Sequence, residues 1–278
     1  METAPHKGVG TEGQRGKGTR VEPTARLRAF LLFLPFPSAA LPLCRSAPFH
    51  VTLRDMPEID FRRTPVTILL AIAIIALEAV CTMDPARRFY YYETLHLGIS
   101  SGVWRGQLWQ PFTTTLLHGS LLHAAFNVWW LWVFGQFLEP RLGSPRFLAL
   151  TVLLAYTSSL PQFVWGYYSQ GFGGMVGFSG VVYGLFGWLW MGSRVDPAFR
   201  AVCNAGTVKV MLIWFVLCIL MTQAHMMLVG NLAHGAGLVF GVLFGLAAYG
   251  RNYRRAWQIM AGFATLVVLA SMVIHPAG

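Results

Sequence analysis

Residues 171–190 read GFGGMVGFSGVVYGLFGWLW, a glycine-rich approach to an apolar segment that contains one serine, Ser179. Glycine destabilises helices, and a lone hydroxyl in an apolar helix usually bonds to its own backbone. A helix from Ser179 to Gly192 would rise about 21 Å, which is less than the roughly 30 Å hydrocarbon core of a membrane. We therefore expect Ser179 to begin its helix below the membrane surface. Irregular backbone at that depth is tolerated only where protein buries it or where it lines a water-filled cavity.

The 278-residue chain has the composition of a membrane protein. It is 55% hydrophobic and only 12% charged, whereas soluble domains carry about 25% charged residues. Its net charge of +10 does not indicate nucleic-acid binding, because the basic residues lie dispersed between apolar blocks. The cysteines are too far apart for a metal site or a disulfide framework. They are Cys44, Cys81, Cys203 and Cys218.

Seven segments are apolar and long enough to suggest membrane spans. They are 66–83, 115–138, 147–168, 176–193, 208–228, 230–250 and 256–274. The chain is therefore predicted to be an all-α polytopic membrane protein. The seventh segment is an additional C-terminal span that follows the basic stop RNYRR at 251–255.

The basic residues predict the orientation of these spans, because cytoplasmic loops carry an excess of Lys and Arg. On the side of residue 60 the connections contain Arg54, Arg62, Arg63, Arg141, Arg146, Arg194, Arg200, Lys209, Arg251, Arg254 and Arg255. The opposite side contains only Arg87, Arg88 and Arg105, all in the long aromatic connection 84–114. The side of residue 60 is therefore expected to be cytoplasmic.

The N-terminal region differs from the rest of the chain. Its apolar piece AFLLFLPFPSAALPLC (29–44) resembles the hydrophobic part of a signal peptide, but prolines interrupt it or lie at its edges. We expect 1–55 to be a disordered or mis-annotated extension, with Met56 as an alternative start and a targeting peptide as the second interpretation. The predicted core is 56–250, and 251–278 is a basic linker with the extra span.

Polar residues inside the second span invite a partner or a function, because they are costly in a membrane. The run TTTLLHGSLLHAAFNVWWLW contains His118, His123 and Asn127. The last two are four residues apart and therefore share one helix face. Hydrogen bonding between helices would also explain them.

The sixth span carries a histidine on a stripe of small residues. In GNLAHGAGLVFGVLFG, His234, Gly237 and Gly241 fall on one helix face, and small residues at such spacing let two backbones approach closely. The fourth span has a matching set, Gly180, Gly184 and Gly187. Contact between these two faces would place His234 beside Ser179.

A serine beside a histidine is the arrangement of covalent acyl transfer. Ser179 would attack a carbonyl, His234 would take and return the proton, and the Ser179 N–H with His123 and Asn127 would hold the oxyanion. The predicted spans two, four and six contain no Asp or Glu, so a dyad rather than a triad is expected. Tyr183, one turn after the serine, is placed to stack on the imidazole.

Residues from about 60 to 250 resemble the rhomboid family of intramembrane serine proteases. The resemblance rests on HGSLLHAAFN, GFSGVVYG and AHGAGLVFG in the second, fourth and sixth spans, with LEPRLGSPRF after the second. It implies a six-helix core whose active site opens to the non-cytoplasmic side. It also implies Ser179 as nucleophile, His234 as general base, and an oxyanion hole of His123, Asn127 and the Ser179 amide. The supporting positions that we expect are Gly177, Tyr183, His118, Gly237 and Gly241.

The family resemblance also implies the partners of the chain. The expected substrates are single transmembrane segments, cut in the lipid bilayer near its surface at small residues beside helix-weakening sequence; no metal, cofactor or nucleic acid is implied. Two features depart from the family pattern. Trp109-Gln110 stands where rhomboids often have Trp-Arg, and the six-plus-one span order differs from the one-plus-six order of mitochondrial members. We expect a multi-pass protein of the bacterial inner membrane.

Three other interpretations fit parts of the sequence. A catalytically inactive, client-binding rhomboid-like protein would typically lack the serine or the histidine, and this chain has both. A metalloprotease using His118, His123 and His225 would need a motif such as H-E-x-x-H, which the sequence lacks. A transporter with broken helices fits the glycine interruption, but the motif has no repeat in the other half of the chain.

Overall fold

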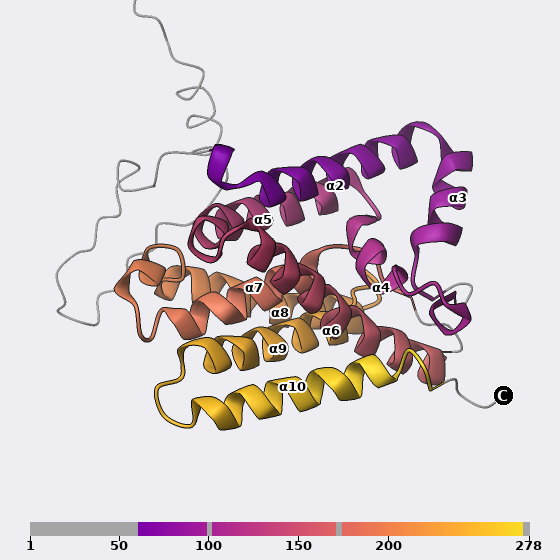
Figure 1. The fold of residues 1–278 in the computed structure, drawn as a ribbon. Coiled ribbons are helices and arrows are strands. Elements are labelled where there is room, and N and C mark those ends of the chain that lie inside the picture. Colours follow the sequence, from indigo (N-terminus) through magenta and orange to yellow (C-terminus); the bar gives the residue numbers. More distant parts are fainter. Residues whose placement is uncertain (1–60, 99–101, 171–173, 275–278) are drawn as a thin grey trace, which may run out of the picture. The chain divides into compact units, whose positions relative to one another are not determined.

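The computed structural model describes residues 61–98, 102–170 and 174–274 (Figure 1), and this part of the chain is helical without β-strands. Seven of its helices correspond to the predicted spans. They are α2 (Pro65–Met83), α5 (Leu121–Leu142), α6 (Ser144–Gln170), α7 (Ser179–Gly192), α8 (Ala205–Gln223), α9 (Asn231–Tyr249) and α10 (Arg254–Ala270). The predicted extension 1–55 lies outside the described residues, so the division into three regions stays a prediction.

The prediction of an all-α polytopic membrane protein is confirmed. In the described part of the chain, 5 helices are long and apolar enough to cross a membrane, namely α2, α5, α6, α8 and α9. The other two are shorter, because α7 has 14 residues and α10 has 17. The short helix predicted from Ser179 to Gly192 coincides with α7.

The second span begins later than the predicted 115–138. Its helix, α5, starts at Leu121 because Ser120 caps it, with the Ser120 hydroxyl accepting a hydrogen bond from the His123 N–H at 3.3 Å. Residues Thr114–Leu116 form the separate 3-10 helix η3. His118 therefore lies in the connection before the helix and not within the span.

The same helix also ends later than predicted, which brings Glu139 into it. Glu139 is fully buried. Its carboxylate accepts hydrogen bonds from the Val66 N–H at 2.9 Å, the Thr67 N–H at 2.8 Å and the Thr67 hydroxyl at 2.7 Å. The expectation that this span lacks a buried acid is thus wrong for the whole helix, but the carboxylate satisfies the free N–H groups at the start of α2.

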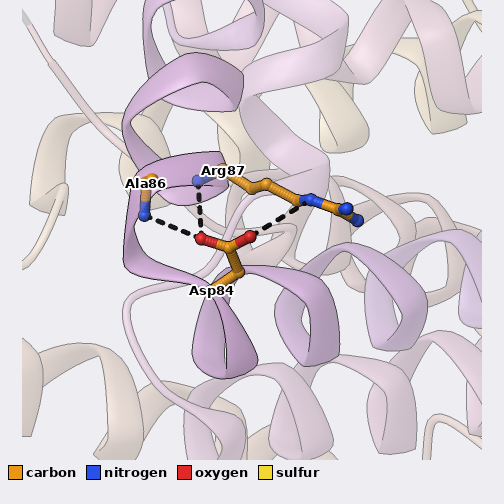
Figure 2. A network of polar contacts seen from close by, with 3 residues as sticks. All are labelled: Asp84, Ala86 and Arg87. Carbon is orange, nitrogen blue, oxygen red and sulfur yellow. Dashed lines mark hydrogen bonds and ion pairs between the residues drawn. The ribbon is translucent and has the colours of Figure 1, made fainter.

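The connection 84–114, predicted as a long aromatic loop, is partly helical. It contains α3 (Pro85–Leu95), η2 (Gly102–Arg105) and α4 (Gln110–Thr113). Figure 2 shows why α3 starts where it does. Asp84 Oδ1 accepts from the N–H groups of Ala86 and Arg87 at 3.0 and 3.2 Å, and Asp84 Oδ2 pairs with the Arg87 guanidinium at 3.2 Å. Asp84 is therefore an N-cap.

The Trp109-Gln110 pair holds the end of this connection. The Trp109 indole N–H donates to the Thr94 carbonyl at 3.2 Å, at the end of α3. Gln110 is fully buried, and its amide donates to Gln107 Oε1 at 2.6 Å. The Gln110 side chain is thus bonded to a residue of the same connection.

Helices α7 and α9 pack against each other along their glycine faces, and α10 lies along α9 (Figure 1). A Cβ atom on Gly237 would overlap the Gly180 carbonyl oxygen, and one on Gly241 would overlap the Gly184 carbonyl oxygen. Only glycine allows backbones to approach this closely. This contact brings the first turns of the two helices together.

Candidate active site

Ser179 and His234 form a hydrogen bond between the first turns of α7 and α9. His234 Nε2 lies 2.7 Å from Ser179 Oγ, although the residues are 55 positions apart in the chain. Ser179 is half-buried, whereas His234 is only 4% exposed. The distance suits proton transfer between a nucleophile and its base.

The imidazole of His234 is held by an aromatic ring. The Tyr183 ring centroid lies 4.8 Å from that of His234, and the planes are inclined by 35°. The Tyr183 hydroxyl donates to the Met211 carbonyl at 3.1 Å, which fixes the tyrosine between α7 and α8. Among the described residues His234 Nδ1 has no hydrogen-bond partner. Packing, rather than a carboxylate, therefore orients the ring.

The turn before the serine requires glycine at Gly177. Its φ of +113° lies in the left-handed region, which other residues rarely adopt. A Cβ there would also lie 2.6 Å from Cε1 of His123. The absence of a side chain thus allows the His123 ring to lie against the backbone two residues before Ser179.

His118 supports the same turn from the preceding connection. Its Nε2 accepts a hydrogen bond from the Phe178 N–H at 3.3 Å, and its Nδ1 lies 3.1 Å from the Leu116 carbonyl oxygen. These partners assign the hydrogen to Nδ1, which makes the ring neutral. The rings of His118 and His123 meet edge to face at 4.9 Å. His118 therefore holds the residue that precedes the serine.

The remaining candidate donors are the backbone of Ser179 and the side chain of Asn127. Ser179 is the first residue of α7, so its N–H has no acceptor within the helix. Asn127 is buried and donates one amide hydrogen to the His123 carbonyl at 3.0 Å. Its Oδ1 has no partner among the described residues. One hydrogen of that amide remains for a further acceptor.

Gln162 is a site residue that sequence reasoning missed. Its side-chain Oε1 accepts from the N–H groups of Leu232 at 3.1 Å and Ala233 at 3.3 Å. It therefore caps the start of α9, directly before His234, from the neighbouring helix α6. The signal was the polar run TSSLPQ at 157–162 in an apolar span, where each polar group is expected to have a partner.

We expect Gln162→Leu to lower both turnover and thermal stability, because the first N–H groups of α9 lose their acceptor. Loss of a cap costs about 0.5–2 kcal/mol. Gln162→Glu keeps an oxygen at this position and should retain most of the activity. Thermal unfolding in detergent and cleavage of a model substrate would measure both effects. Equal activity of the Leu variant and the wild type would show that the cap does not position His234.

The described part of the chain contains no group of three or more His, Cys, Asp or Glu side chains placed to hold a metal ion. His118 and His123 lie together, as their ring contact shows. Both rings lie at the turn before Ser179, where His118 accepts from the Phe178 N–H and His123 lies against Gly177.

A comparison with protein-family models matches residues 105–251 to the Rhomboid domain. This chain belongs to the rhomboid family. Two curated relatives, each named "Rhomboid protease GlpG", come from Salmonella paratyphi A (strain ATCC 9150 / SARB42) and Salmonella choleraesuis (strain SC-B67). They are 30% and 31% identical to this chain over 200 residues, which is 71% of this chain.

The matched region covers 66% of the length of these relatives. The family predicted from the three motifs is confirmed, and so is the prediction of an integral, multi-pass membrane protein. Both curated relatives carry the name of a protease.

Proposed function

We propose that this rhomboid is an intramembrane serine endopeptidase that cleaves transmembrane segments of other membrane proteins. The observation that carries the proposal is the 2.7 Å contact between His234 Nε2 and Ser179 Oγ at the start of a short apolar helix. The names of the curated relatives support the same reaction class.

In the proposed reaction, Ser179 Oγ attacks the carbonyl carbon of the scissile peptide bond while its proton passes to His234 Nε2. His234 then gives this proton to the departing amine, so that the C–N bond breaks and an acyl-enzyme ester remains. A water molecule, deprotonated by His234, attacks the ester and releases the carboxyl product and the serine.

The oxyanion of each tetrahedral intermediate would be held by the Ser179 N–H, His123 and Asn127. His123 lies against Gly177 in the turn before the serine, and Asn127 is one helical turn further along α5. Donors fixed before the reaction are effective because they need no reorganisation when the charge develops.

The proposed substrate class rests on the depth that we expect for the serine and on the chemistry of peptide helices. A carbonyl in an intact transmembrane helix is hydrogen-bonded and surrounded by side chains, so the segment must unwind before attack. Small or helix-weakening residues reduce the cost of unwinding and leave room near Ser179. We therefore propose single transmembrane segments with such residues near the membrane surface as substrates.

The proposed orientation places the start of α7 on the non-cytoplasmic side, as the distribution of basic residues indicates. Reporter fusions after Arg146 and after Arg200 should give cytoplasmic signals, and a fusion near Gln170 should give an external one. A cytoplasmic signal near Gln170 would reverse the orientation and place the serine on the opposite side of the membrane.

The proposed function is tested by labelling the protein in membranes with a fluorophosphonate probe and mapping the modified peptide. We expect the label on Ser179 and its loss in Ser179→Ala. Ser193→Ala is a control, because Ser193 lies at the other end of α7 and its hydroxyl donates to the Trp190 carbonyl at 2.8 Å. A folded protein that takes no label would favour the inactive, client-binding interpretation.

A further inference from the structure

The C-terminal helix α10 contacts the first outer connection at a point far from it in sequence. The Trp104 indole N–H donates to the Ser271 carbonyl at 2.8 Å, across a separation of 167 positions. Trp104 belongs to η2, and Ser271 directly follows α10. This hydrogen bond joins the end of α10 to the connection whose later residues contact the turn before Ser179.

Apolar packing reinforces this hydrogen bond. The Trp104 ring lies 4.8 Å from the rings of Phe163 and Tyr167 on α6. Beneath it is a small core that is separate from the main one, and α10 packs against this core. The core consists of Leu97, Val103, Leu160 and Phe163, and it is covered by Val268 and Leu269 of α10 and by Met272, which follows this helix. Helix α10 is thus part of the packing that holds η2.

The outer segment, defined here as residues 102–118, is tied to α6 along its length. The Tyr156 hydroxyl donates to the Leu108 carbonyl at 2.7 Å, and the Ser159 hydroxyl donates to the Pro111 carbonyl at 2.8 Å. Two side-chain hydrogen bonds therefore hold the segment to α6.

The far end of the outer segment holds the backbone that precedes Ser179. The Thr114 hydroxyl donates to the Met175 carbonyl at 2.5 Å, and His118 accepts from the Phe178 N–H at 3.3 Å. A displacement of the outer segment would therefore move the turn before Ser179 and the start of α7.

We propose that α10 stabilises the active site through the outer segment, with Trp104 as a positioning residue. The inference rests on the proposed protease function and assigns a role to the seventh span. Helix α10 holds one end of the outer segment, and the other end holds residues 175–178. Without the Trp104–Ser271 hydrogen bond, the segment is more mobile and the serine is less often in its reactive position.

The test compares Trp104→Phe with Trp188→Phe. Both changes keep an aromatic ring and remove one indole hydrogen bond. Trp188 Nε1 donates to the Tyr249 hydroxyl at 3.2 Å. Trp188 lies in the last part of α7, away from Ser179. Trp104→Phe should lower kcat for a model transmembrane substrate about three- to tenfold, the usual effect of one hydrogen bond, with KM nearly unchanged. Trp188→Phe should retain the wild-type kcat.

A truncation after Ala270 removes the Ser271 acceptor and leaves α10 complete. It also removes Met272 from the small core, so it should lower kcat at least as much as Trp104→Phe does. Adding Trp104→Phe to the truncation should cost little more, because the hydrogen bond is already lost. Additive losses would show that the two residues act separately and would overturn the proposal.

Hydrogen exchange of the amides in 102–118 provides a readout that does not need activity. Exchange should be faster in Trp104→Phe than in Trp188→Phe and the wild type. Unchanged exchange, or faster exchange with an unchanged kcat, would overturn the proposal. A wild-type protein that fails to cleave would instead count against the protease function, and the exchange rates would still decide whether α10 holds the segment.

Discussion

Ser179→Ala and His234→Ala should each abolish almost all cleavage of a model transmembrane substrate, and the double variant should lose little more. The reason is that in the proposed mechanism the two groups act as one unit, since the serine would be activated only by the base 2.7 Å from it. Effects of such groups are strongly non-additive. The measurement is the initial rate of cleavage in reconstituted membranes for the wild type, the two single variants and the double variant.

Changes at the proposed oxyanion donors should have smaller effects than changes at the proposed dyad. Removal of one donor typically costs on the order of 10²–10³ in rate, and less where another donor compensates. His123→Ala and Asn127→Ala should therefore retain measurable cleavage. Asn127→Asp is a sharper variant, because it keeps the size of the side chain but places a carboxylate where an oxyanion would develop.

Two outcomes of this series would contradict the proposal. Normal turnover by Ser179→Ala would exclude this serine as the nucleophile and favour client binding. Equal losses in Ser179→Ala and Ser193→Ala would indicate a general defect in the protein. If the proposal holds, Ser179→Ala should still bind substrate and can be used to capture it.

Gly241→Leu should abolish activity while the protein remains inserted in the membrane. The Cβ atom of any side chain here would overlap the Gly184 carbonyl oxygen and lie 2.8 Å from its Cα. Because these atoms belong to the backbone of α7, they cannot move aside without a shift of the whole helix. Overpacking costs about 1–3 kcal/mol, occasionally more, and the separation of α7 from α9 would also part His234 from Ser179.

Gly262→Leu is the matched control for this change. Gly262 lies in α10, and a Cβ there would meet no atom within 4 Å. It should retain wild-type turnover and thermal stability in detergent, whereas Gly241→Leu should lose both. Full activity of Gly241→Leu would mean that the two glycine faces do not meet at this position.

Much of the fold was predictable because its signals are local in the chain. Span length and hydropathy predicted the membrane helices, and the glycine-rich run before Ser179 predicted a helix that begins there and ends at Gly192, as α7 does. The glycine stripe that includes Gly241 indicated close contact with another helix. Such features depend on residue type and helical period, which a sequence contains directly.

The ends of α5 were not predicted correctly, although the cap at its start is also local. The apolar run from 115 concealed the cap at Ser120, whose hydroxyl accepts from the His123 N–H. At the other end Glu139 was expected to lie outside the span. A buried carboxylate is tolerated there because Val66 and Thr67, more than 70 positions earlier, supply its hydrogen bonds.

The contacts that position the candidate site join distant parts of the chain and have no periodic signal. Gln162 caps α9 from α6, 70 positions away from Leu232, and Trp104 reaches Ser271 across 167 positions. A hydrogen bond between two helices depends on the relative position and rotation of both, which side-chain packing sets. The residue types in the motifs therefore predicted the chemistry, whereas the packing of α6, α9 and α10 determined which polar groups hold the histidine and the outer segment in place.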